Sequence, residues 1–76
     1  MKLNHTQYLV VNEIGETVVS YDDIGRLTSW LSGKRHGHLK IIVIGTKGRA
    51  QVLDIIPDLI EFPKILNRTM TQLTLP

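Results

Sequence analysis

The sequence predicts a small α+β domain of ββαββ order: a four-stranded, mostly antiparallel sheet with one helix on a face and an irregular C-terminal segment. Two observations lead to this fold class. Short runs rich in β-branched residues come in two pairs, and each pair encloses a turn that contains glycine. Between the two pairs lies one stretch whose apolar residues recur at helical spacing.

The first pair of runs covers residues 8–11 and 17–21. The connection between them, residues 12–16, is short and contains Gly15. Glycine adopts positive φ without steric cost, which a hairpin turn with a bulge requires. We therefore expect the two runs to form an antiparallel hairpin.

The helix is expected over residues 22–32. Its apolar stripe follows the i, i+3, i+7 pattern and consists of Ile24, Leu27 and Leu31. Ser20 or Asp22 can accept the unpaired N–H groups of the first turn, and Asp22 and Asp23 place negative charge at the positive end of the helix dipole. Gly33 stands where a left-handed residue is expected just beyond the C-terminus.

The second pair of runs covers residues 39–44 and 50–56, with two glycines in the turn at residues 45–49. Pro57 ends the second run, because proline cannot donate a hydrogen bond to a neighbouring strand. This pair completes the predicted sheet.

After Pro57 the sequence predicts little regular structure. Pro57 and Pro63 bracket a segment that we expect to form one helical turn at most. The threonine-rich residues 67–76 are expected to be a flexible tail or an edge strand. Residues 1–66 would then be the single domain, with 67–76 as its tail.

The apolar pattern of two strands raises the question of what covers the sheet. Residues 8–11 and 41–44 do not alternate apolar with polar, so both sheet faces carry apolar groups. One helix covers one face. The second face needs a second copy, a partner, or the segment after Pro57, which we favour as a lid formed by Leu59, Ile60, Phe62, Ile65 and Leu66.

Composition narrows the class of protein. The chain has 76 residues and no cysteine, which excludes disulfides, a thiolate zinc site and a cysteine nucleophile. The longest purely apolar run, residues 41–44, is far shorter than the roughly 20 residues of a membrane-spanning helix. No export signal precedes it. We expect a single cytoplasmic domain without membrane contact.

The formal net charge of +2 is unevenly distributed. Residues 1–23 sum to −3, residues 24–53 to +6 and residues 54–76 to −1. The basic block over residues 26–49 contains no acidic residue. Its charges are either solvated side chains at loops and strand ends, or a patch that meets phosphate or an acidic protein surface.

No pattern in the chain indicates catalysis. His36 and His38 lack a second cluster at metal-ligand spacing, so an ordinary polar loop is favoured over a metal site. The turn at residues 45–49 lacks the order of a phosphate-binding loop and the helix that should follow it. No serine has a plausible histidine base. We expect no enzymatic activity, no cofactor and no metal.

Trp30 is the strongest candidate for a contact residue. Arg26, Trp30 and Lys34 follow i, i+4, i+8 spacing along one edge of the predicted helix, and Arg35 follows directly. An aromatic ring with a basic rim is typical of interface hot spots. The alternative is that Trp30 folds over the margin of the core. Lys47 and Arg49 in the second turn form a weaker alternative site.

The size, the hairpin–helix–hairpin plan over residues 7–56 and the lack of a catalytic constellation resemble small bacteriophage-encoded proteins that bind host RNA polymerase. The resemblance implies a non-catalytic regulator that inhibits or redirects transcription through surface contacts in the host cytoplasm. A nucleic-acid-binding accessory protein that uses the basic block at 26–49 is the alternative function. A homodimer with packed sheets is a third possibility.

Overall fold

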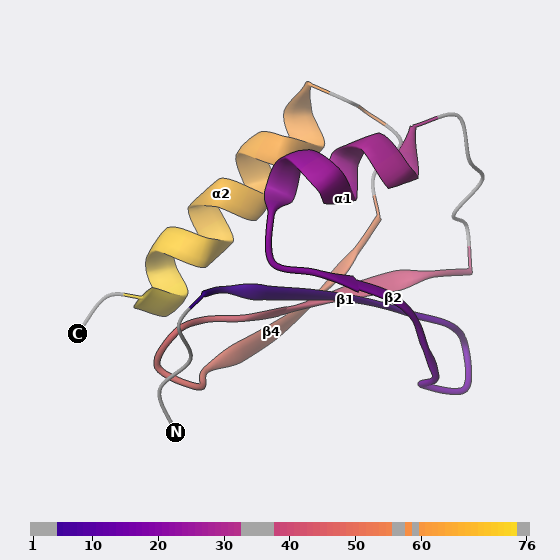
Figure 1. Ribbon diagram of the computed structural model, residues 1–76, viewed down its shortest axis with the longest axis horizontal. Helices are drawn as coiled ribbons and strands as arrows, with labels where there is room; N and C mark the ends of the chain where they lie inside the picture. Colours follow the sequence, from indigo (N-terminus) through magenta and orange to yellow (C-terminus); the bar gives the residue numbers. More distant parts are fainter. Residues whose placement is uncertain (1–4, 33–37, 56–57, 59, 75–76) are drawn as a thin grey trace.

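The computed structural model describes residues 5–32, 38–55, 58 and 60–74. It confirms the α+β class and the four-stranded antiparallel sheet, whose strand order is β2-β1-β3-β4. Two helices lie together over one face of this sheet (Figure 1). The elements are β1 (Gln7–Val11), β2 (Thr17–Tyr21), α1 (Ile24–Leu31), β3 (Lys40–Ile44), β4 (Ala50–Asp54) and α2 (Glu61–Thr74).

The two hairpins form as predicted and join through β1 and β3. Gly15 has φ +83° in the β1–β2 turn, and Gly48 has φ +86° in the β3–β4 turn. The β1–β2 register shifts between Val10 and Val11, which is the expected bulge. In the centre of the sheet, β1 pairs with β3 in antiparallel register, with Val10 opposite Ile41.

Helix α1 is shorter than the predicted 22–32, and its N-cap is Asp23 rather than Ser20 or Asp22. Asp23 is extended (φ −129°, ψ 124°), and its carboxylate accepts the N–H of Gly25 at 3.2 Å. Ser20 is a residue of β2 and cannot cap the helix. Gly33, the predicted C-terminal glycine, lies outside the described residues, and the observed C-cap is Ser32.

The expectation for the C-terminal part was wrong: in place of an irregular segment and a tail or edge strand, the chain forms the 14-residue helix α2. The Asp58 carboxylate accepts the N–H groups of Ile60 and Glu61, both at 2.9 Å, and so caps the helix start. Pro63 lies in the first turn, where the helix tolerates proline. The buried stripe of α2 consists of Phe62, Leu66, Thr69 and Leu73.

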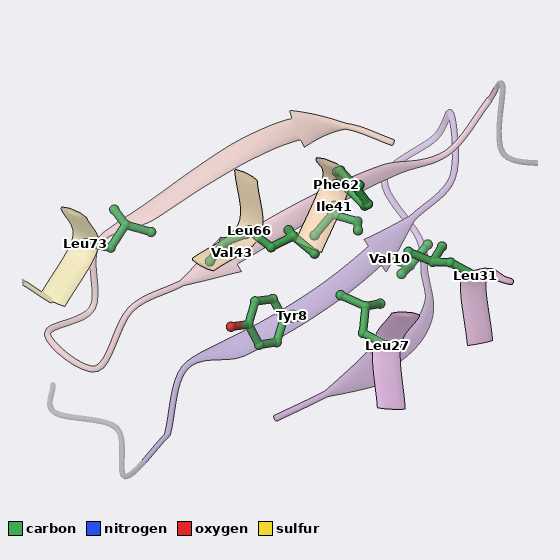
Figure 2. Packing of buried hydrophobic residues seen from close by; sticks show 9 residues of the cluster. All are labelled: Tyr8, Val10, Leu27, Leu31, Ile41, Val43, Phe62, Leu66 and Leu73. Carbon is green, nitrogen blue, oxygen red and sulfur yellow. The ribbon is translucent and has the colours of Figure 1, made fainter. Parts of the chain in front are cut away.

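The core lies between this helical layer and the sheet. Tyr8 and Val10 of β1 meet Leu27 of α1 and Leu66 of α2 there (Figure 2). The complete buried cluster is Tyr8, Val10, Leu27, Leu31, Ile41, Val43, Phe62, Leu66 and Leu73. Leu27 and Leu31 confirm the predicted helix stripe, while Ile24 is only partly buried.

The expected lid over the second sheet face does not form. Phe62 and Leu66 pack on the same face as α1, whereas Ile60 is 73 % exposed and Leu59 lies outside the described residues. Four strands span roughly 19 Å and a helix about 10 Å, so one face already needs two helices. We call the opposite side the open face; its apolar residues include Leu9, Val18, Ile42, Ile44, Ala50 and Val52.

The contact of Gly45 with α2 generates a first prediction. A Cβ at Gly45 would lie 2.8 Å from the Cβ of Leu73 and 3.0 Å from its carbonyl oxygen. Gly45→Ala should therefore lower the free energy of unfolding by about 1–3 kcal/mol, because helix backbone must move. Gly25→Ala is the control: its nearest neighbour is 3.5 Å away, and alanine should stabilise α1 slightly. Urea denaturation measures both, and equal effects would contradict the close packing.

The cap of α2 generates a pH prediction. The N–H groups of Glu61 and Ile60 hold the pKa of Asp58 below its ordinary value of 3.8. A lowered pKa means that the ionised form stabilises the fold above pH 3.8, and that this contribution is lost as pH falls through the folded pKa. Asp58→Asn keeps an acceptor but cannot titrate. The variant should have the lower Tm at neutral pH, and the difference should vanish in acid; a pH-independent difference would contradict this role.

Candidate partner-binding surface

One edge of α1 brings together two of the predicted contact residues. Trp30 is partly buried and packs against the core, whereas Arg26, one turn earlier, is exposed. Both line an open hollow of about 500 Å³ between α1 and the end of β2. The lining residues are Tyr21, Asp23, Gly25, Arg26, Ser29 and Trp30. We call this hollow the α1 edge.

Local sequence explains how the α1 edge is built. Tyr21 ends β2, and Asp23 begins the helix by capping Gly25, so only one residue separates the strand from the cap. This tight connection places Tyr21 beside the first turns of α1. Trp30 lies further along the helix, at the edge of the buried stripe. The hollow therefore has two aromatic rings, one cation and one carboxylate.

The negative charge of Asp23 also acts on Tyr8, a residue of the neighbouring core. Burial raises the pKa of the Tyr8 phenol, and the negative charge of Asp23 raises it further. Tyr8 is therefore neutral at physiological pH and behaves as a core residue.

The sequence did not predict Tyr21 as a lining residue, and it assigned Asp23 only a role at the positive end of the helix dipole. The signal available was the short connection between the second strand and the helix.

Two further predicted contact residues, Lys47 and Arg49, lie apart from this hollow. Lys47 and Arg49 are exposed near and in the β3–β4 turn, and neither lines the hollow of the α1 edge. Lys34 and Arg35 lie outside the described residues. The basic block of the sequence therefore forms no single patch among the residues that the structure describes.

A second hollow, of about 390 Å³, lies at the end of the sheet near the β1–β2 turn. Lys40 and Asp54 line it and form an ion pair at 3.2 Å, with side chains 58 % and 81 % exposed. An ion pair this exposed contributes little stability. The other lining residues are Asn12, Glu13, His38 and Leu39.

The described residues contain no group of three or more histidine, cysteine or acidic side chains that could hold a metal ion. His38 is exposed, and His36, the other histidine of the polar loop expected from the sequence, lies outside the described residues. No described helix has the length and apolar character needed to span a membrane. No known protein family, curated protein or solved structure matches the chain.

The burial of Trp30 generates a prediction on stability. Leu27 is fully buried, so Leu27→Ala should lower the free energy of unfolding by about 2–5 kcal/mol through lost burial and a cavity. Trp30→Ala should cost less, because the indole is only partly buried and solvent can fill its place. Chemical denaturation compares the two variants. A larger loss for Trp30→Ala would make the ring a core residue and remove it as a contact candidate.

Proposed function

We propose that the chain is a small non-catalytic regulator that binds a protein of the bacterial transcription machinery, RNA polymerase, and inhibits or redirects transcription. The observation that carries the proposal is the α1 edge. There Trp30 and Tyr21 line an open hollow beside the exposed cation of Arg26. Aromatic rings and arginine are the residues most enriched at protein–protein hot spots.

The chemistry of the α1 edge suits a protein surface with an acidic rim. A partly buried indole is held in place by its own core contacts, so it loses little side-chain entropy when a partner covers it. Arg26 would steer an acidic partner surface toward the ring. Asp23 is engaged as the N-cap of α1 and partly offsets this positive charge.

The target within this class rests on the resemblance of plan to bacteriophage-encoded polymerase-binding proteins. The ββαββ order with an antiparallel sheet is consistent with that plan, and the added helix α2 departs from the sequence expectation. A target of this kind also implies that the chain works in the cytoplasm of a bacterial host. Because one fold can serve many functions, binding to the polymerase is the measurement that tests this target.

Nucleic-acid binding remains the second candidate function, and Lys47 and Arg49 are the observation in its favour. Both are exposed beside one turn, where they can contact phosphates. Neither lines the hollow of the α1 edge, where a single cation, Arg26, lies beside the two aromatic rings, whereas single-strand binders typically combine such rings with a cationic groove.

Binding of the fluorescently labelled chain to purified bacterial RNA polymerase tests the proposal. Trp30→Ala should raise the Kd about 30-fold, corresponding to a hot spot of about 2 kcal/mol. Arg68→Ala is the matched control, because it removes an exposed cation of α2 that does not line the α1 edge. Its Kd should stay unchanged. Absence of binding, or equal effects of both variants, would overturn the proposal.

A salt titration separates the two candidate functions. Binding through phosphates gives a steep linear fall of log affinity with log salt, and Lys47→Ala should reduce that slope. Binding through the α1 edge should depend weakly on salt and should not respond to Lys47→Ala.

A further inference from the structure

We propose that β4 pairs edge to edge with β4 of a second copy of this chain, so that two four-stranded sheets join into one eight-stranded sheet. The proposal is independent of the partner proposed for the α1 edge, because β2, which borders that hollow, and β4 lie at opposite edges of the sheet. Three features carry it: the outward-pointing backbone groups of β4, an edge with nothing in β4 to block it, and the match of β4 with itself.

The hydrogen bonds of the β3–β4 hairpin show which backbone groups of β4 point outward. Gly45 donates its N–H to the carbonyl oxygen of Arg49 at 2.7 Å, so these two residues form a hydrogen-bonded pair at the turn. Hydrogen-bonded and non-hydrogen-bonded pairs alternate along an antiparallel ladder. Gln51 and Leu53 are therefore the β4 residues that exchange hydrogen bonds with β3. The backbone groups that point away from β3 are the N–H and C=O of Ala50, Val52 and Asp54.

Within β4 there is no feature of the kind that usually keeps sheet edges apart. The strand contains no proline, lysine or arginine, and it pairs with β3 in one regular register without a bulge. Its one charged residue, Asp54, forms an ion pair with Lys40 of β3. The other edge strand, β2, has a bulge in its pairing with β1. Gln51 is exposed although it points to the helical side, so the helices do not overhang the β4 edge.

The sequence of β4 matches itself when two copies run antiparallel. If Val52 lies opposite Val52 of the second copy, Ala50 lies opposite Asp54, and every such pair can exchange two backbone hydrogen bonds. On the helical side, Gln51 then lies opposite Leu53. No like charges face each other in these pairs, and the two-fold symmetry makes each contact twice.

The same pairing extends the apolar surface of the open face. Leu9, Ile42 and Val52 form a row across β1, β3 and β4, and Val52 at its end is 56 % exposed. A two-fold axis through the Val52 pair joins the rows of the two copies end to end on one face of the longer sheet. Contact between two β-branched side chains on neighbouring strands is favourable.

The joined sheet has room for the helices of both copies. Helix α2 packs against β3, and the two β3 strands lie three strand spacings apart, roughly 14 Å. A helix with its side chains is about 10–12 Å wide, so the two α2 helices fit side by side. Main-chain hydrogen bonds supply the affinity of strand pairing, and β4 has only five residues, so we expect a weak dimer.

Sedimentation equilibrium of the intact chain, at concentrations up to about 1 mM, measures the dimer. Val52→Pro removes an outward N–H that β3 does not use, a position where an edge strand tolerates proline. It should raise the dimer dissociation constant at least about tenfold. Val52→Thr is the matched control, because threonine keeps the N–H and the β-branched shape, and its dissociation constant should stay close to that of wild type. A monomeric wild-type chain, or equal effects of both variants when circular dichroism shows them folded, would overturn the proposal.

A cross-link tests the register without removing any hydrogen bond. The chain has no cysteine, so one introduced cysteine forms a disulfide only with a second copy. Facing residues of a hydrogen-bonded pair have Cα atoms about 5.5 Å apart, within the range of a disulfide. Under mild oxidation, Val52→Cys should therefore form a covalent dimer at least about tenfold faster than Gln51→Cys, which faces Leu53 instead of itself. Equal rates on a non-reducing gel would overturn the proposed pairing.

Discussion

The antiparallel pairing of β1 with β3 is the constraint on which the rest of the structure depends. Each hairpin alone is two-stranded and marginal, and this pairing joins them into one sheet. Its register also assigns the faces: Val10 and Ile41 point to the helices, while Leu9 and Ile42 point away. A slip by one residue would exchange the two sets. Because β3 lies beside β1, the chain leaves the edge strand β2, forms α1 and re-enters the sheet as β3 on the other side of β1.

Because both helices pack on one face of the sheet, the two sides of the molecule differ. Helix α1 contacts β2 and α2 contacts β3, so the helices divide one face of the sheet between them (Figure 1). The α1 edge belongs to this helical side, whereas Leu9, Ile42 and Val52 belong to the open face on the opposite side. The α1 edge and the open face are therefore separate surfaces that share no residue.

Local rules predicted the strands, their turns and α1, because β-branched runs, Gly15 and the Leu27–Leu31 stripe act over a few neighbouring residues. Helix α2 was missed because two prolines seemed to forbid it, although Asp58 and Glu61 have the spacing of a helix cap before an apolar stripe. Of the candidate site, Arg26 and Trp30 follow from helical spacing alone. Tyr21 was not predictable in this way, because its place beside α1 depends on tertiary structure.

The position of β4 at the edge of the sheet has a consequence for the dynamics of the chain. β4 pairs with β3 alone, and four of its five residues are exposed. Little apolar burial opposes its detachment, so its amide protons should exchange with solvent through local opening, at a lower free energy than those of β1 and β3. Each such opening removes Val52 from the sheet and transiently exposes the outer edge of β3.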